Sequence, residues 1–372
     1  MSTQLHHMPA DEAASEGLAL LQTLLDIRSP SGHETPAVTY LVDWMSRRGF
    51  SAHRDAAGNA IGILSESGAA GNGSSQRMRE IVLLGHIDTV PGFPRVTIRG
   101  DKLYGRGAVD AKGPLAAFVT AAGIVGPIPG WRIVVVGAVE EESATAKGAR
   151  YIASKRAPDM AVIGEPTGWQ RMALGYKGRL LADVTVQRLV SHTAGPSLGA
   201  PEMAVAFWNC VTQKIAELNA GKEKIWDQVT PSLRNFNTSN DGLLETVQMH
   251  LGFRVPIAVT PDQVKALIVA CDDNVGITFS GEDLAYRSEK NSPLVRLFLN
   301  AIRSQGGTPG FTLKTGTSDM NTVGPIWRCP IVAYGPGDST LDHTPHEHVS
   351  LEEWRRGATV LAEMLRQAVA QT

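Results

Sequence analysis

Three apolar, β-branched runs constrain the fold of this chain most, because each is followed directly by acidic or histidine side chains. With the polar residues that end them, the runs span residues 80–86, 131–142 and 160–165. Such runs are typical of strands buried on both faces, as in a parallel sheet. Helical patterns lie between them, so the sequence predicts an α/β fold with a mainly parallel sheet. Ligands bind at the carboxyl ends of such strands, where these polar residues fall.

The pattern changes near Arg179, and 372 residues are too many for one ordinary domain. Strand and helix patterns then alternate in the order βαββαβ as far as residue 287, which predicts a small ferredoxin-like domain. We therefore expect an inserted domain at 179–287. The catalytic domain would be formed by residues 1–178 and 288–372.

Composition excludes several classes of function. The formal net charge of −2 disagrees with a nucleic-acid-binding surface and with a polybasic membrane-binding segment. No run approaches the ~20 apolar residues that span a bilayer, and the N-terminus lacks the features of a signal peptide. The three cysteines, Cys210, Cys271 and Cys329, are widely spaced and odd in number. We expect no disulfide framework and a reducing, cytoplasmic compartment.

Five polar segments lie at or just after the predicted strand ends or in loops that follow them. Taken singly, each has a structural explanation: a hydrogen-bonded buried histidine, a helix cap at Asp110, or a solvated run at Glu140–Glu142. Taken together, they supply two histidines and three carboxylates, which suit Zn²⁺, Co²⁺ or Mn²⁺ and could hold two ions around a shared aspartate. Asp88 is placed to orient His86 as an outer partner.

The motifs at 85–91, 105–113, 140–142, 165–167 and 343–345 resemble, in this order, those of the di-zinc amidohydrolases. That group includes aminoacylases, glutamate carboxypeptidases, acetylornithine deacetylases and succinyl-diaminopimelate desuccinylases. The resemblance covers nearly the whole chain. It implies two divalent cations, with Zn²⁺ expected and Co²⁺ as the alternative, and a cis peptide after the bridging aspartate.

The resemblance also implies roles for individual residues. Glu141 would be the general base and Asp88 would orient the first histidine. A slip of one residue would instead make Glu140 the base and Glu141 a ligand, and both registers stay open at this point. The implied metal ligands, of which Asp110 would bridge the two ions, are His86, Asp110, Glu142, Glu165 and His343.

Two further assignments fall in the inserted domain. By resemblance, His192 would reach the active site of the partner subunit and steady the oxyanion, which implies a homodimer joined through this domain. Arg254 resembles the arginine that holds the substrate's carboxylate. Their structural alternatives are a surface turn for His192 and a strand residue with its head in solvent for Arg254.

Segments 313–321 and 236–242 resemble the lysine and ornithine hydrolases that act with an amino-group carrier protein. The resemblance implies release of lysine or ornithine from the carrier's C-terminal glutamyl side chain, and a small acidic carrier protein as partner. Alternatives are a deacetylase for acetylornithine, acetyllysine or acetylcitrulline, or a dipeptidase or carboxypeptidase. A non-enzymatic alternative is a metal-bound protein that binds a small ligand.

Overall fold

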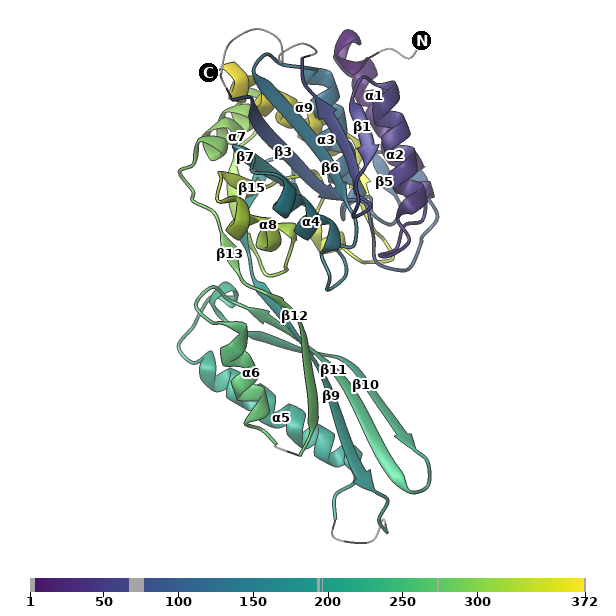
Figure 1. Ribbon diagram of the computed structural model, residues 1–372, viewed down its shortest axis with the longest axis vertical. Coiled ribbons are helices and arrows are strands. Elements are labelled where there is room, and N and C mark those ends of the chain that lie inside the picture. The colour runs from purple at the N-terminus through teal and green to yellow at the C-terminus, as the bar shows by residue number, and fades with distance from the viewer. Residues whose placement is uncertain (1–3, 67–76, 193–194, 196, 273, 371–372) are drawn as a thin grey trace. The chain divides into compact units, whose positions relative to one another are not determined.

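The computed structural model describes residues 4–66, 77–192, 195, 197–272 and 274–370, and contacts divide the chain into two units (Figure 1). Unit 1 comprises Met1–Gly175, Ser288–Thr312 and Ser318–Thr372. Unit 2 comprises Tyr176–Arg287 and Leu313–Thr317. The second part of unit 2 is the short segment that the sequence pattern had left in the catalytic domain.

The large sheet of unit 1 contains the three apolar runs as neighbouring strands. Its order is β1-β2-β6-β3-β7-β15-β8, in which the steps from β6 to β15 are parallel and the outer steps are antiparallel. The α/β fold with a mainly parallel sheet is thus confirmed, with antiparallel strands at its margins. The strands are β1 (Ser51–Arg54), β2 (Ala60–Leu64), β3 (Arg79–His86), β6 (Trp131–Ala138), β7 (Met160–Gly164), β8 (Arg171–Tyr176) and β15 (Ile331–Ala333).

A second, small sheet of unit 1 brings two distant segments together. It has the order β16-β5-β4, and all its pairs are antiparallel. Strands β4 (Thr97–Arg99) and β5 (Lys102–Tyr104) form a hairpin, and β16 (His348–Ser350) joins it from near the end of the chain. Because of this pairing, the loop after β5 lies beside the loop before β16. Two short strands, β13 (Tyr286–Arg287) and β14 (Gly310–Lys314), occur where the chain passes between the units.

Helices lie on both faces of the large sheet (Figure 1). The central helix α3 is buried from Lys112 to Gly123, as expected for a helix that is apolar all round. It packs against α1 and α9, and a Cβ at Gly17 of α1 would collide with Thr120 and Trp354. The helices are α1 (Ala10–Asp26), α2 (Thr35–Arg47), α3 (Lys112–Val125), α4 (Lys147–Lys155), α7 (Pro293–Ser304), α8 (Asp319–Trp327) and α9 (Leu351–Ala370), with 3₁₀ turns η1 (Leu5–His7) and η3 (Ser339–Leu341).

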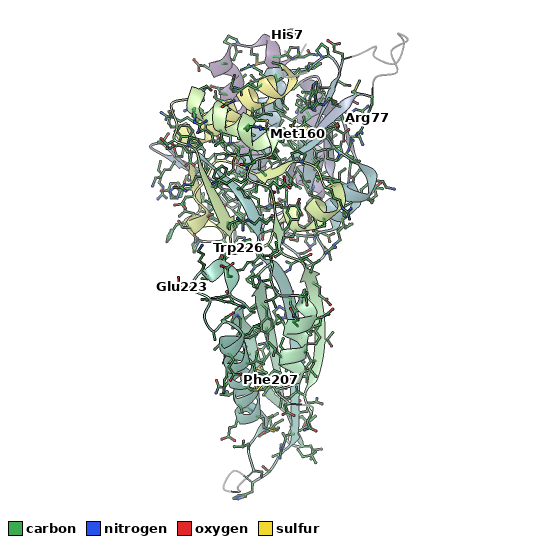
Figure 2. All side chains as sticks on the ribbon, turned by 90° about the vertical axis from the view of Figure 1, so that its left-hand side faces the viewer. His7, Arg77, Met160, Phe207, Glu223 and Trp226 are labelled. Carbon is green, nitrogen blue, oxygen red and sulfur yellow. A yellow bond between two sulfur atoms is a disulfide. The ribbon has the colours of Figure 1, made fainter. Side chains whose placement is uncertain are left out.

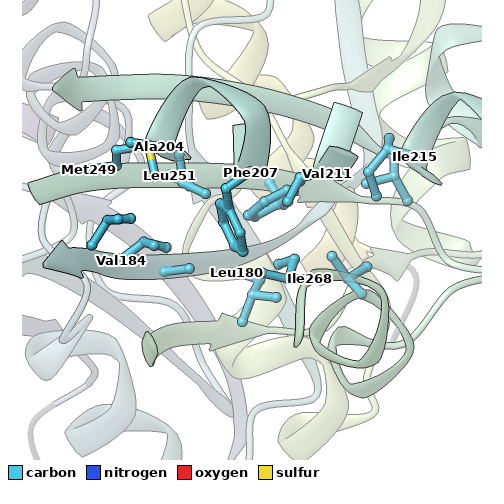
Figure 3. Packing of buried hydrophobic residues seen from close by; sticks show 14 of the residues in the cluster. Leu180, Val184, Ala204, Phe207, Val211, Ile215, Met249, Leu251 and Ile268 are labelled. Atoms are coloured by element: carbon cyan, nitrogen blue, oxygen red, sulfur yellow. The ribbon is translucent and has the colours of Figure 1, made fainter. Parts of the chain in front are cut away.

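Unit 2 has the predicted βαββαβ order. Its sheet runs β10-β11-β9-β12 with all neighbours antiparallel, which is the ferredoxin-like arrangement. Alternate residues of β9, from Leu180 to Val186, point into a core that α5 and α6 cover (Figure 3). Figure 2 shows Phe207 of this core on α5. The elements are β9 (Gly178–Leu189), α5 (Ala200–Leu218), η2 (Ile225–Asp227), β10 (Thr230–Asn240), β11 (Leu244–Val255), α6 (Pro261–Val269) and β12 (Gly276–Asp283).

One expectation from the cysteines is wrong. Cys210 on α5 and Cys271, just after α6, form a disulfide, with their Cα atoms 5.8 Å apart. Their separation of 61 positions hides this proximity in the sequence, and the structure brings them together because α5 and α6 pack on one face of the sheet. Cys329 is a free thiol. Among the described residues, no helix is long and apolar enough to cross a membrane.

Candidate metal centre

His86 is the last residue of β3, which is buried along almost its whole length. Its ring Nδ1 lies 3.0 Å from the main-chain oxygen of Asp88. A hydrogen bond from Nδ1–H to a carbonyl fixes the ring and leaves Nε2 available to a cation. The carboxylate of Asp88, which was expected to make this contact, lies 3.6 Å from Nδ1. The main chain of Asp88 therefore orients the ring.

The carboxylate of Asp88 holds the turn that follows β6. It is completely buried, and its two oxygens accept hydrogen bonds from the backbone N–H groups of Glu141 and Glu142, each at 3.0 Å. Ser31 donates its hydroxyl to the same carboxylate at 2.6 Å. One buried acid thus fixes the main chain of two of the three consecutive glutamates.

Glu140 is bonded within its own loop. Its backbone is left-handed (φ 60°), and its carboxylate accepts hydrogen bonds from Thr145 at 2.6 Å and Lys147 at 3.2 Å. Its backbone N–H donates to the buried carboxylate of Glu34 at 3.2 Å. Neither Ser31 nor Glu34 was predicted as a site residue. In the sequence, both residues lie in a short polar turn before a helix, and the same pattern is found in ordinary helix caps.

Asp110 lies between the two histidines of the predicted ligand set. Its Oδ1 is 3.2 Å from Nε2 of His86, and its Oδ2 is 3.0 Å from Nε2 of His343. The N-cap residue of α3 is Ala111, so Asp110 does not occupy the capping position. The peptide bond Asp110–Ala111 is cis, as the family resemblance implies. A carboxylate whose two oxygens face different imidazoles has the layout of a bridging ligand.

His343 reaches the same place from the loop after η3, where its backbone is left-handed (φ 62°). Its Nε2 also lies 2.9 Å from Oε1 of Glu142. The hydrogen bonds with Asp110 and Glu142 raise the pKa of His343 to about 10. Because a histidine must be deprotonated to bind a metal, a cation bound here would take the place of this proton.

Glu141 and Glu165 complete the cluster of acids. Burial raises the pKa of Glu141 well above its usual range; the charge of His86 opposes this shift and Glu165 adds to it. Burial also raises the pKa of Glu165, and repulsion from Asp110 adds to that shift. Asp319, at the start of α8, repels both glutamates and was not predicted as a site residue. Carboxylates buried together in this way call for cations that neutralise them.

The donor set fits divalent metal ions. Ligand atoms about 2.0–2.2 Å from a tetrahedral zinc lie roughly 3.5 Å from one another. The observed separations between the ligating atoms of His86, Asp110, Glu142 and His343 are 2.9–3.2 Å. One oxygen or nitrogen from each of His86, Asp110 and Glu142 falls within 4.8 Å of the others. The mixture of imidazole and carboxylate favours Zn²⁺ or Co²⁺ over metals that prefer thiolates.

The two remaining predicted residues belong to unit 2. His192 is exposed and follows the end of β9, while Thr193 and Ala194 of its motif lie outside the described residues. Arg254 lies near the end of β11, half-buried, and its Nη1 donates to the Thr317 hydroxyl at 2.6 Å. The Thr317 hydroxyl donates in turn to the main-chain oxygen of Lys177 at 3.2 Å. The segment Leu313–Thr317 therefore belongs to the surroundings of Arg254.

Two relatives match this chain in sequence over most of their own length. A "[LysW]-lysine hydrolase" of Deinococcus radiodurans is 42% identical over 371 residues, covering 97% of this chain and 98% of the relative. A "[LysW]-lysine/[LysW]-ornithine hydrolase" of Sulfurisphaera tokodaii is 34% identical over 286 residues, covering 74% of this chain and 77% of the relative.

Solved structures with the same fold are more distant in sequence. The M20 family metallo-carboxypeptidase Sso-CP2 from Sulfolobus solfataricus has a TM-score of 0.75 at 18% identity, covering 94% of this chain and 98% of that one. Human carnosine dipeptidase 1 has a TM-score of 0.73 at 15% identity, covering 98% of both chains. The model of peptidase family M20/M25/M40 matches residues 82–367. The resemblance predicted from the motifs is therefore confirmed, and the chain belongs to peptidase family M20/M25/M40.

Proposed function

We propose that this chain hydrolyses the amide bond that joins lysine, or ornithine, to the C-terminal glutamyl side chain of a small acidic amino-group carrier protein. The observation that carries the proposal is the 42% identity, over nearly the full length of both chains, with the "[LysW]-lysine hydrolase" of D. radiodurans. The relative from S. tokodaii adds ornithine as a second amino acid to be released. Unit 1 contains a cluster of histidines and carboxylates of the kind that metal-assisted amide hydrolysis uses.

The proposal assigns His86, Asp110, Glu142, Glu165 and His343 as ligands of two divalent cations, with Zn²⁺ expected and Co²⁺ as the alternative. The position of Asp110 between the two imidazoles supports its role as the bridging ligand. When bound, the cations would acidify the attacking water and polarise the carbonyl of the scissile amide.

Glu141 is the general base of this proposal. Its Oε2 lies 4.0 Å from Nε2 of His86, so the carboxylate borders the ligand cluster. Glu141 accepts a proton from the attacking water as the water oxygen bonds to the amide carbon. It then delivers this proton to the nitrogen of the departing lysine as the C–N bond breaks. The contacts of Glu140 with Thr145 and Lys147 favour this register over the one shifted by a residue.

The assignments in unit 2 rest on the family resemblance. His192 would donate a hydrogen bond to the oxyanion of the tetrahedral intermediate, and Arg254 would bind the carboxylate of the released amino acid. The proposal includes a homodimer joined through unit 2, in which His192 serves the partner subunit. A cytoplasmic location belongs to the same proposal, because the carrier-linked reaction is a step of amino-acid biosynthesis.

The test compares amine release from four substrates by metal-stripped enzyme and by enzyme reloaded with Zn²⁺ or Co²⁺. The first is a carrier-tail peptide in which the α-amino group of lysine is joined by an amide bond to the side chain of the terminal glutamyl residue. The second is the same peptide linked through the ε-amino group of lysine, and the others are acetyllysine and acetylornithine. The proposal predicts metal-dependent cleavage of a carrier-tail peptide with a higher kcat/KM than that of either acetylated amino acid, and the two linkages show which amino group of lysine is joined to the carrier.

Two outcomes would overturn the proposal. Faster cleavage of acetyllysine or acetylornithine would make the chain a deacetylase of free amino acids. If enzyme with two bound cations released no amine from any of the four substrates, the alternative of a metal-bound binding protein would replace the enzymatic one.

A further inference from the structure

We infer that Glu347 is a positioning residue of the metal centre, which holds the main chain of Asp110 and, through Arg106, the loop that carries His343. The inference rests on the assignment of Asp110 and His343 as metal ligands. Neither Glu347 nor Arg106 has a role in the proposed chemistry.

Glu347 is a buried carboxylate that accepts three main-chain hydrogen bonds. It is 1% exposed. Its Oε1 accepts from the backbone N–H groups of Gly107 at 2.9 Å, Val109 at 3.0 Å and Asp110 at 3.1 Å. All three donors belong to the turn that ends in the bridging aspartate. Burying a carboxylate costs free energy unless it is fully hydrogen-bonded. These contacts therefore stabilise the buried carboxylate and also fix the main chain of the turn.

Arg106 extends the same contact to the second histidine. Its Nη1 donates to Oε2 of Glu347 at 2.6 Å, and its Nη2 donates to the main-chain oxygen of His343 at 3.4 Å. Its Nε donates to the main-chain oxygen of Gly92 at 2.9 Å. The side chain of Arg106 is 6% exposed, so little water competes for these donors. One buried ion pair thereby connects the main chain of two ligand-bearing loops.

The geometry explains why the pair would matter to the metal. His343 has a half-exposed ring on a loop, and its Nε2 lies 3.0 Å from Oδ2 of Asp110. A ligand on an exposed loop keeps its position only if other residues bind its main chain, as Arg106 does for His343. Partners outside the ligand shell typically change metal affinity or activity by about 10–100-fold when removed.

The test is the E347Q variant, which keeps the shape of the side chain but places an amide opposite Arg106. The matched control is E80Q. Glu80 is also a buried acid paired with arginines, Arg132 at 3.4 Å and Arg156 at 2.8 Å, but it lies near the start of β3, about 20 Å along the strand from His86. Metal affinity is measured by competition with a chromogenic chelator, and the ligand field by the visible absorption spectrum of Co²⁺-loaded protein.

We expect E347Q to bind at least one cation about 10–100-fold more weakly and to change the Co²⁺ spectrum, with KM unchanged and kcat restored by excess metal. E80Q should lower the melting temperature of the metal-free protein without either effect. Metal affinity and spectrum equal to wild type in E347Q would overturn the inference and leave Glu347 a structural residue. If E347Q does not fold, R106K, which keeps the charge but not the three contacts, gives the same readings. A wild-type protein that binds no divalent cation would instead overturn the metal assignment itself.

Discussion

The two units hold their proposed functional side chains in different ways. In unit 1, the proposed ligands Asp110 and Glu142 and the proposed base Glu141 lie on turns whose backbone N–H groups donate to two buried carboxylates, Asp88 and Glu347. In unit 2, the side chain of Arg254 donates to the hydroxyl of Thr317, and His192 is exposed. These backbone contacts organise the proposed site of unit 1 before substrate arrives, whereas the proposed roles in unit 2 depend on the side chains of His192 and Arg254.

Substitutions in unit 1 and in unit 2 should therefore have different effects. Changes to the carboxylates of unit 1 should alter proton transfer or the bound metal. Changes in unit 2 should alter turnover or substrate binding while the metal content stays the same.

The largest effect is expected for E141Q. Because the amide cannot accept the proton of the attacking water, kcat should fall by about 10²–10⁴-fold while two cations stay bound. Activity is measured with the α-linked peptide, and metal content by elemental analysis. E140Q is the matched control and should keep most of its activity, since Glu140 is bonded to Thr145 and Lys147. A reversal of the two phenotypes would establish the register shifted by one residue.

The next effect is expected for H192A. Loss of one donor to an oxyanion costs about 10²–10³-fold in kcat, so kcat should fall by about 100-fold with metal content and melting temperature unchanged. The control is H250A, which removes the unit 2 histidine that pairs with Asp183 at 2.8 Å. An H192A enzyme with the kcat of wild type would remove His192 from the mechanism.

A smaller effect on a different constant is expected for R254M. A hydrogen bond between charged groups contributes about 1.5–3 kcal/mol, so KM for the α-linked peptide should rise by about 10–100-fold. T317V, which removes the hydroxyl that Arg254 contacts, should raise KM by less than R254M does. If R254M instead lowered kcat and the metal content, Arg254 would belong with the organising residues of unit 1.

Much of the fold could be predicted because its main elements are long and regularly patterned. The apolar runs of β3, β6 and β7 and the βαββαβ order of unit 2 are visible in the sequence. Short elements such as β14 and α8 were not predicted, since a few residues give no clear periodicity. The pairing of Cys210 with Cys271 was missed for another reason: it depends on which face of the sheet the two helices cover.

In the candidate site, the proposed ligands could be predicted from the sequence, but the residues that hydrogen-bond to their main chain could not. The predicted ligands fall in motifs, so the resemblance identified them one by one. The residues that hold them were not identified, because their partners are remote: Arg106 and Glu347 are 241 positions apart, and Ser31 and Asp88 are 57 apart. An acid that accepts backbone N–H groups leaves no pattern in its own neighbourhood. Such contacts become visible only when the main chain is placed.

The smallest effect on activity is expected from the disulfide of unit 2. In the C210A/C271A double variant, loss of a cross-link that closes a loop of 61 residues should lower the free energy of unfolding of unit 2 by about 2–4 kcal/mol. Metal content should not change, because the proposed ligands all lie in unit 1. The measurement is denaturant unfolding, with C329A as the control.

Thiol counting checks the disulfide independently. Burial raises the pKa of Cys329 to about 12, so its thiol should react only after denaturation, as one thiol per unreduced chain. Three reactive thiols per chain, with a double variant as stable as wild type, would show that the pair is reduced in solution and that hydrophobic packing alone holds α5 to α6.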